Sequence, residues 1–242
     1  VPPDLTKPRR FLSETELGRR LKASASLIAI AEKVIAPVCR AGPQREYIYI
    51  LCNPDLVVLK IFAAPEVLAA AERAGVKPGT VFTEESCGTN ALALARERNR
   101  LVAIRGEQHY CRLFKDWWCV AAPVKDPNGK ISGYLDISMH AEKELGLGAA
   151  LLQVMVTSIE REFSMLELHH RRQMLTLPPK MEQQLTSREQ KVLQLLLLGL
   201  TNEEIAKELG ISTRTVETHQ KGIYRKVGVH SLRQLLRMLQ GK

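Results

Sequence analysis

Hydrophobic residues follow two different periods along the chain, and the change of period separates two kinds of structure. The run YIYILCNPDLVVLKIF, which ends at Phe62, is rich in β-branched and aromatic residues on both sides of Asn53-Pro54-Asp55 and predicts a β-hairpin. Further strand-like runs cover 101–104, 120–125 and 131–138, the last two around the turn sequence DPNG. Helical segments are predicted at 64–74 and 89–98. This order predicts an α+β domain with an antiparallel sheet.

From residue 149 to residue 175 the apolar period changes to alternating steps of four and three, with no Gly or Pro. The residues in this heptad seam are Leu152, Val156, Ile159, Phe163 and Leu166. The segment predicts a helix of roughly 40 Å that pairs with a second copy as a coiled coil. The alternative is an amphipathic helix that packs on its own sheet. A second helical stripe, which could join the pair, contains Leu17, Leu21, Leu27, Ile28, Ala31 and Ile35.

Beyond a predicted linker at Leu177-Pro178-Pro179-Lys180, the last sixty residues predict four short helices. Their N-caps are Thr186 or Ser187, Thr201, Ser212 and Ser231. Only Gly210-Ile211-Ser212 separates the second helix from the third. That spacing predicts a helix-turn-helix, whose second helix enters the major groove of DNA.

Composition narrows the class of protein. The 242 residues, 45% hydrophobic and 25% charged, are enough for two globular modules of unequal size. No apolar run is long enough to span a membrane, and no signal peptide is visible, so we expect a cytoplasmic protein. The five cysteines form no CxxC pair, which fits reduced thiols.

The net charge of +9 is unevenly distributed. Residues 181–213 hold three Lys/Arg against five acidic residues, whereas residues 214–242 hold seven against one. Four of these seven cations lie on the third helix of the predicted helix-turn-helix: Arg214, Lys221, Arg225 and Lys226. A basic second helix favours binding to the phosphates of DNA. A basic helical bundle with a solvated charged face is the alternative.

The stretch LTSREQKVLQLLLLGLTNEEIAKELGISTRTVETHQKGIYRKVGV resembles the DNA-binding domain of LuxR/NarL-type regulators. The resemblance implies that Glu217, Thr218 and Lys221 face base edges. It implies that other residues position the DNA backbone, namely Thr201, Asn202, His219, Arg225 and Lys226. The DNA-binding set is completed by Thr213, Arg214 and Thr215 at the start of the helix. Glu217 stands where many members carry Lys, and a carboxylate there accepts from a cytosine amino group.

The segments ESCGTNALALA and GEQHYCRLFKDWWCVAAPVKDPNGKISGYLDIS are similar to the GAF domains at the head of acetoin- and glycerol-type transcriptional activators. The resemblance covers about residues 10–145 and implies a domain that holds a small ligand between its sheet and the surrounding helices. The chain has no GxxxxGK[ST] phosphate loop, which excludes the ATPase of those activators.

The candidate ligand-binding residues are Thr89, Asn90, His109, Tyr110, Trp117 and Trp118. Tyr and Trp combine an apolar body with a polar tip that suits small-molecule recognition. For Thr89 and Asn90 the alternative is a helix cap, and for the aromatic residues it is packing in the core.

A candidate metal or redox site consists of Cys87, His109, Cys111 and Cys119, which could hold zinc or iron. Their spacing matches no standard zinc finger, and buried structural thiols are the alternative. GAF-fold enzymes of the free methionine sulfoxide reductase type use such thiols as nucleophiles, but a DNA-binding tail is unexpected on one.

Together these features predict a GAF-like sensor domain (1–145), a connecting and dimerising helix (146–177) and a four-helix LuxR-type domain (178–242). The predicted function is a non-enzymatic transcriptional regulator that responds to a ligand or to redox state. Its expected partners are double-stranded DNA at a two-fold-related operator, a small-molecule effector, a second copy of the chain and RNA polymerase. The alternatives are a thiol-dependent enzyme and a protein-interaction module.

Overall fold

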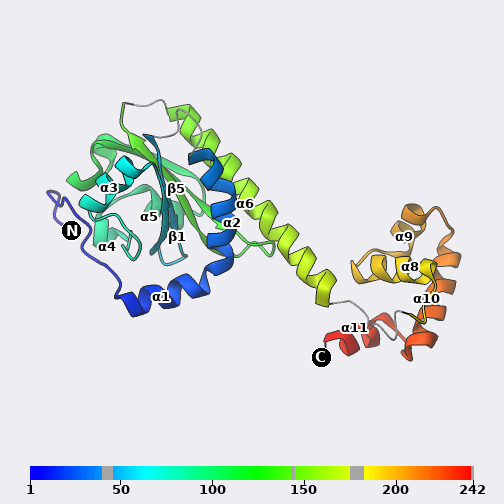
Figure 1. The fold of residues 1–242 in the computed structure, drawn as a ribbon. Coiled ribbons are helices and arrows are strands. Elements are labelled where there is room, and N and C mark those ends of the chain that lie inside the picture. The colour runs from blue at the N-terminus through cyan, green and yellow to red at the C-terminus, as the bar shows by residue number, and fades with distance from the viewer. Residues whose placement is uncertain (40–45, 143–144, 175–182, 241–242) are drawn as a thin grey trace. The chain divides into compact units, whose positions relative to one another are not determined.

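A computed structural model describes residues 1–39, 46–142, 145–174 and 183–240 of the chain (Figure 1). The chain divides into two compact units, Val1–Ser164 and Met165–Lys242. The predicted linker at 177–180 lies outside the described residues. Within the described part, no helix is long and apolar enough to cross a membrane.

The N-terminal unit is built on a five-stranded antiparallel sheet, as the sequence predicts. The strands are β1 (Ile48–Cys52), β2 (Val58–Phe62), β3 (Val102–Arg105), β4 (Trp117–Lys125) and β5 (Ile131–His140). Their spatial order is β2-β1-β5-β4-β3, so the last strand of the unit occupies the centre of the sheet. The predicted hairpin pairs Tyr49 with Phe62, and β4 pairs with β5 along almost its whole length.

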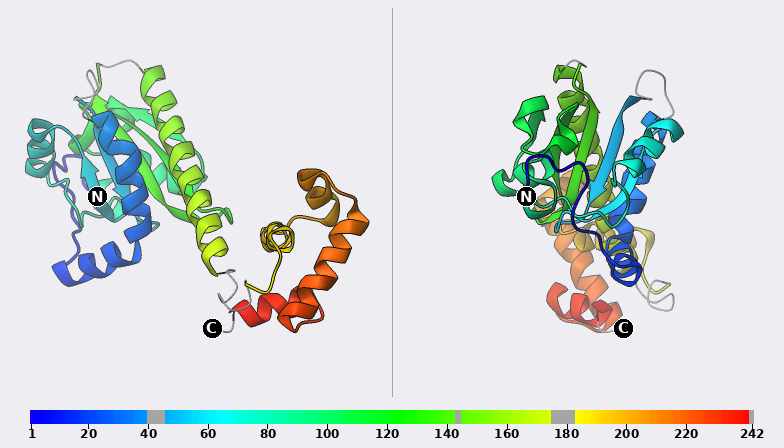
Figure 2. Two further views of the ribbon diagram at one scale, coloured as in Figure 1. Left: turned by 45° about the vertical axis from the view of Figure 1, so that its right-hand side comes forward. Right: turned by 90° about the vertical axis from the view of Figure 1, so that its left-hand side faces the viewer.

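Helices cover both faces of this sheet. The N-terminal unit contains α1 (Glu14–Ala23), α2 (Ala25–Cys39), α3 (Pro65–Arg73), α4 (Glu84–Cys87), α5 (Ala91–Arg98) and α6 (Leu145–Met174), which runs past its end. Two short 3₁₀ turns follow β3: η2 (Gly106–Gln108) and η3 (Arg112–Phe114). One core lies between the sheet and α2 and α6, and a second lies between the sheet and α3, α4 and α5 (Figures 1 and 2).

The heptad seam predicted on α6 faces its own sheet. Leu152, Val156 and Ile159 are buried in the first core, together with the β-strand residues of that face. These side chains are therefore not available to a second chain, and the prediction of a coiled coil through them is wrong. The apolar spacing was identified correctly. The apolar side of a helix can, however, pack on a β-sheet as well as on a second helix, and here it packs on the sheet. The opposite side of α6 carries Leu147 and Val154, which are 61% and 64% exposed.

The N-terminal helical stripe forms two helices, because the chain breaks at Ser24 between α1 and α2. Leu27, Ile30, Ala31 and Ile35 of α2 are buried against the sheet, whereas α1 buries no residue. Residues 1–12, which we term the N-terminal strap, cross the other side of the unit (Figure 2). The strap is hydrogen-bonded through its backbone to residues near α4 and η3, and these contacts fix its path.

The C-terminal unit contains the four predicted helices: α8 (Ser187–Leu197), α9 (Asn202–Leu209), α10 (Thr213–Val227) and α11 (Leu232–Gln240). Thr186 and Thr201 are the N-caps of α8 and α9, as the sequence predicts, and each forms a capping box with the Glu three residues on. All four helices pack on one apolar core that includes Val192, Ile205 and Ile223.

Candidate nucleic-acid interface and ligand pocket

The turn between α9 and α10 holds the two helices in a helix-turn-helix. Gly210 ends α9 with a left-handed backbone, φ 63°, which glycine adopts without steric cost. Ser212 then caps α10, and its side chain accepts from the amide of Thr215. The three-residue connection therefore forms as the sequence predicts: the N–H of Gly210 donates to the last carbonyls of α9, and the hydroxyl of Ser212 accepts from the first turn of α10.

The two sides of α10 differ in character. Val216, Ile223 and Val227 are buried in the core of the C-terminal unit. The opposite stripe is exposed and consists of Arg214, Glu217, Thr218, Lys221 and Arg225. Apart from the adjacent pair Glu217 and Thr218, these residues are separated by steps of three and four, so they lie along one side of the helix. Five of the residues that the sequence assigns to DNA therefore share one outward surface.

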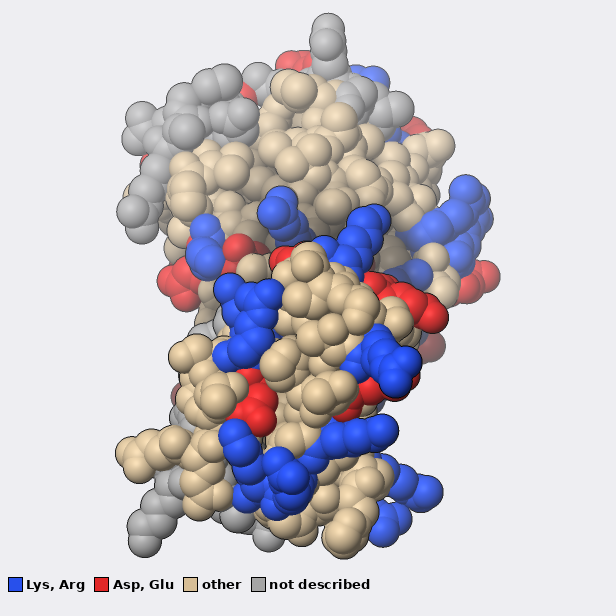
Figure 3. All heavy atoms as spheres, turned by 90° about the vertical axis from the view of Figure 1, so that its right-hand side faces the viewer, with Lys and Arg blue, Asp and Glu red and all other residues tan. Residues whose placement is uncertain are grey.

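The three cations in this exposed stripe form no ion pair with any residue that the structure describes. Neither Arg214, Lys221 nor Arg225 has an ion-pair partner in the part of the chain that the structure describes. Figure 3 shows Lys and Arg side chains gathered over the face of the C-terminal unit that is turned to the viewer. An unpaired cation on an exposed helix is available to a phosphate without first breaking an internal contact.

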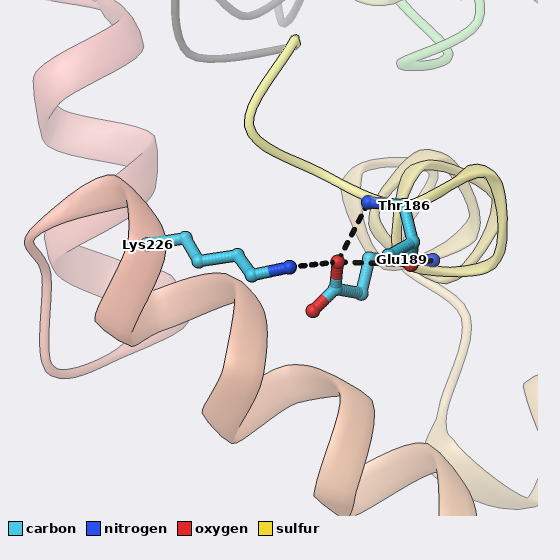
Figure 4. Close-up of polar contacts among 3 residues, drawn as sticks. All are labelled: Thr186, Glu189 and Lys226. Atoms are coloured by element: carbon cyan, nitrogen blue, oxygen red, sulfur yellow. Dashed lines mark hydrogen bonds and ion pairs between the residues drawn. The ribbon is translucent and has the colours of Figure 1, made fainter.

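Lys226, which the sequence assigns to the DNA backbone, is engaged inside the protein (Figure 4). Its Nζ donates to Oε2 of Glu189 at 2.6 Å, and the same oxygen accepts from the backbone N and the hydroxyl of Thr186. Glu189 is only 7% exposed. Burial raises the pKa of Glu189, but the bonds from Lys226 and Thr186 outweigh it, and the net pKa is lowered. The pair joins α10 to the start of α8.

The remaining predicted DNA residues divide between exposed and engaged side chains. Thr201 and Thr213 are exposed, and His219 is half-buried. Asn202 Oδ1 accepts from Gln220 Nε2 at 2.6 Å, a contact that ties α9 to α10. Thr215 shares a hydrogen bond with Ser212 at the N-terminus of α10. The sequence did not predict that Lys226 pairs with Glu189 or that Asn202 pairs with Gln220. No local sequence pattern links residues that are 37 or 18 positions apart.

In the N-terminal unit, the structure does not bring the six candidate ligand residues together. Trp117 and Trp118 are adjacent on β4, so their side chains point to opposite faces of the sheet. Trp118 is fully buried beside α6, where a Cβ added at Gly148 would lie 3.1 Å from its ring. Trp117 lies instead along an open surface groove with His140 and Glu66. Trp118 is a core residue, which was the alternative to ligand binding.

Thr89, Asn90 and Tyr110 also lie in different surroundings. Asn90 is the N-cap of α5: its Oδ1 accepts from the amide of Ala93, and its Nδ2 donates to the carbonyls of Phe82 and Gly88. Every hydrogen-bonding atom of this side chain thus has a structural partner. Thr89 is half-buried at the surface, and Tyr110 is 52% exposed.

His109 is 1% exposed and packs beside the ring of Phe114, with ring centroids 5.8 Å apart. Its Nδ1 donates to the carbonyl oxygen of Gly106 at 3.1 Å, while its buried Nε2 has no hydrogen-bond partner among the described residues. Burial lowers the pKa of His109 more than the bond to Gly106 raises it. The imidazole is therefore neutral near pH 7.

The predicted metal site is not found among the described residues. Among the described residues, which include Cys87, His109, Cys111 and Cys119, no group of three or more His, Cys, Asp or Glu side chains is placed to hold a metal ion. The three thiols are free and buried. Burial raises the pKa of Cys87 to about 12, and it also raises the pKa of Cys111 and Cys119. A protonated thiol is a poor metal ligand and a poor nucleophile.

The polar cluster in this unit centres on Asp136, which the sequence reasoning placed only in a strand. Asp136 is 2% exposed and lies in the middle of β5, between Ile50 of β1 and Ala121 of β4. Ser138 Oγ donates to Asp136 Oδ1 at 2.5 Å and lies 3.2 Å from Cys119 Sγ. The signal in the sequence was an acidic residue inside the apolar strand GYLDIS.

A small cavity adjoins this polar cluster. Its volume is about 20 Å³, and its walls include Asp136, Ser138, Cys119 and Asn90 on the polar side. Ile50, Ala91, Leu92 and the stacked rings of Phe82 and Phe114 close the apolar side. A cavity of this size holds about one water-sized group.

Both units of the chain are similar to parts of known proteins. Residues 183–239 match the family described as "Bacterial regulatory proteins, luxR family". The "Acetoin dehydrogenase operon transcriptional activator AcoR" of Bacillus subtilis (strain 168) is 33% identical over 141 residues, 58% of this chain and 23% of that protein. A "Signal-transduction and transcriptional-control protein" of Clostridium beijerinckii is 25% identical over 157 residues, 65% of this chain and 25% of that protein.

Each of these matches is longer than the C-terminal unit, so each includes residues of the N-terminal unit. The chain spans about a quarter of the length of these two curated relatives. Among solved structures, the E. coli DhaR(N)-DhaL complex contains a chain that matches 71% of this one, with a TM-score of 0.65 and 18% identity, and this chain covers 60% of it. The N-terminal unit therefore has a GAF-like fold.

Proposed function

We propose that this chain, whose residues 183–239 form a DNA-binding domain of the luxR family, is a transcriptional regulator that binds its operator through α10. The observation that carries the proposal is the exposed stripe on α10, with three cations that have no ion-pair partner among the described residues. Relatives named as transcriptional regulators support the same role.

In this proposal, Glu217, Thr218 and Lys221 face base edges at the centre of the exposed stripe. Arg214 and Arg225 lie near the two ends of the same stripe and meet phosphates. Thr201, Thr213, Thr215 and His219 position the DNA backbone. Lys226 and Asn202 act indirectly, because their contacts with Glu189 and Gln220 hold α10 against α8 and α9.

A two-fold-related operator calls for two copies of the chain. Since Leu152, Val156 and Ile159 of the predicted seam are buried, we place the contact between copies on the outward side of α6, where Leu147 and Val154 lie two turns apart and exposed. Half-buried Leu151 lies between them on the same side. Analytical ultracentrifugation is expected to find a dimer for the natural chain and a monomer for Leu147→Glu/Val154→Glu. A dimer that persists in the double variant would contradict this contact.

The N-terminal unit is proposed to sense a small-molecule effector, which changes the operator affinity of the C-terminal unit. Its GAF-like fold and its polar internal cavity support this role. A thiol-dependent enzyme is the rival function. The raised pKa values of Cys87, Cys111 and Cys119 argue against a thiolate nucleophile, and turnover of methionine sulfoxide by the purified chain would favour the rival.

The test of the DNA-binding proposal is the salt dependence of DNA affinity. Lys221→Ala and Arg225→Ala are each expected to weaken binding, and each lost phosphate contact reduces the slope of log K against log salt by about one unit. Lys191→Ala is the matched control, because it removes an exposed Lys from α8 in the same unit. Equal affinities for all three variants and the natural chain would leave a protein-interaction module as the better description.

A further inference from the structure

The cavity beside Asp136 offers strong hydrogen-bond acceptors, and the only free side-chain donor in its described wall is the weak S–H group of Cys119. Both hydrogens of Asn90 Nδ2 are used by the carbonyls of Phe82 and Gly88. The hydroxyl of Ser138 donates to Asp136. The carboxylate of Asp136 and the lone pairs of Ser138 Oγ are acceptors. A group that enters this cavity is best matched if it brings several donors of its own.

In the part of the chain that the structure describes, no cation is paired with Asp136. The one hydrogen bond printed for its carboxylate within the described residues comes from Ser138, and no Lys, Arg or His forms an ion pair with it there. A buried carboxylate without a counter-charge is costly, so the site gains from a ligand that carries one. The stacked rings of Phe82 and Phe114, 5.6 Å apart, line the same cavity, and aromatic faces attract cations.

We propose that the Asp136 cavity binds the ammonium group of a small primary amine, with the short apolar part of the amine held among Phe82, Phe114 and Leu92. The inference rests on the proposed sensor role of the N-terminal unit and names the class of effector. An –NH₃⁺ group has the size of a water molecule, which a cavity of about 20 Å³ holds, and it carries three donors and no acceptor.

The stem of the amine needs room that the cavity does not have, so its two aromatic walls must move outward. Those walls belong to short segments: Phe82 precedes the four-residue α4, and Phe114 ends the three-residue η3. Both segments are hydrogen-bonded to the N-terminal strap, Val81 to the carbonyl of Arg10 and Leu113 to the carbonyl of Leu5. Local opening of these segments leaves the sheet intact.

Calorimetric titration of the full chain with propylammonium chloride, against sodium chloride at equal ionic strength, tests the proposal. Saturable binding is expected for the natural chain, with at least tenfold weaker binding for Asp136→Asn. 1-Propanol has the same size without the charge and is expected to bind at least tenfold more weakly. Asp116→Asn is the matched control, because it neutralises an exposed Asp of the same unit and is expected to bind normally.

A second variant and a pH series guard against a folding defect. Ser138→Ala keeps the carboxylate and is expected to retain binding, a few-fold weaker. Affinity is expected to rise about tenfold from pH 6 to pH 8, because burial raises the pKa of Asp136 to about 7 and the amine stays charged. The other titratable groups on this side include Cys52, Cys87, Cys119 and Tyr134, whose pKa values are raised. His109, which packs beside Phe114, has a lowered pKa, and the cation Arg96 lies on α5.

Absence of propylammonium binding, or equal binding by Asp136→Asn or of 1-propanol, would overturn the proposal. The measurement needs no DNA, so its failure is distinct from that of the proposed function. A chain that binds its operator but no amine would refute only the amine site. A chain that binds the amine but no DNA would refute only the regulator.

Discussion

The two buried carboxylates among the described residues lie in different units and have opposite surroundings. Glu189 has Lys226 at 2.6 Å and two bonds from Thr186, and its pKa is lowered. Asp136 has one bond from Ser138, and burial raises its pKa to about 7. An acid with a complete set of partners stabilises the fold around it. A buried carboxylate with too few hydrogen-bond and charge partners makes its fold less stable, and it can still accept hydrogen bonds from a ligand.

The largest expected effect comes from removing the incompletely paired acid. Between about pH 4 and pH 7 the unfolded chain ionises Asp136 while the folded chain keeps it protonated. The free energy of unfolding of the N-terminal unit should therefore fall as pH rises through this range and then level off. Asp136→Asn removes this dependence and is expected to stabilise the unit at pH 8 by up to about 4 kcal/mol.

Urea unfolding followed by tryptophan fluorescence measures this effect in one unit, because both tryptophans, Trp117 and Trp118, lie in the N-terminal unit. At pH 4 the natural chain and the variant should have nearly equal midpoints. A variant that is less stable than the natural chain at pH 8 would mean that Asp136 is not in an unfavourable environment.

A smaller and opposite effect is expected at the fully paired acid. Lys226→Met should destabilise the C-terminal unit by roughly 3 kcal/mol, because Glu189 is left buried without its counter-charge. Glu189→Gln should cost less, about 1–2 kcal/mol, since an amide keeps part of the hydrogen bonding. Hydrogen exchange of peptides from α8 and α10 measures the change in this unit alone.

Lys226→Met also separates the structural role of Lys226 from a DNA contact. At a temperature where the variant is folded, the salt dependence of its DNA binding should match that of the natural chain. A slope reduced by one unit, as expected for Lys221→Ala, would return Lys226 to the phosphate-binding set.

The pH dependence of the C-terminal unit should have the opposite sign. The folded pKa of Glu189 is lowered, so its stabilising contribution is complete above its usual pKa and is lost as the pH falls through the lower folded value. Acid titration followed by exchange of the α8 peptides should therefore show a loss of protection below about pH 4 in the natural chain. The loss should be weaker in Glu189→Gln.

The smallest effect concerns Gly222, which faces Glu189 from α10. Ala normally stabilises a helix interior over Gly by about 1 kcal/mol. At this position a Cβ would lie 2.8 Å from Glu189 Oε1, so Gly222→Ala is expected to give no gain. In a Glu189→Ala background the usual gain should return, and a double-mutant cycle measures the difference. A full gain in the natural background would show that Glu189 shifts without cost.

Much of the C-terminal unit was predictable because its determinants are local. The capping boxes at Thr186 and Thr201, the αL glycine Gly210 and the apolar steps on α10 each act within a few residues, and all four helices form where the sequence predicts them. The face of α10 that is exposed follows from the same spacing. The spacing does not show which cations of α10 form an ion pair within the protein, because Lys226 pairs with Glu189, which is 37 positions away in the sequence.

In the N-terminal unit, the sequence by itself determined the strands, the antiparallel class and the hairpin turns, since alternation and turn residues act over short distances. Only the tertiary structure decided that the α6 seam packs on its own sheet, and that Trp117 and Trp118 lie apart. It also placed β5 at the centre, so that Asp136 is buried beside Ser138 and Cys119. Apolar spacing shows that one side of a helix must be buried, but it does not show which element buries it. Burial of a charged side chain depends on the order of the strands in the sheet, which no local sequence pattern encodes.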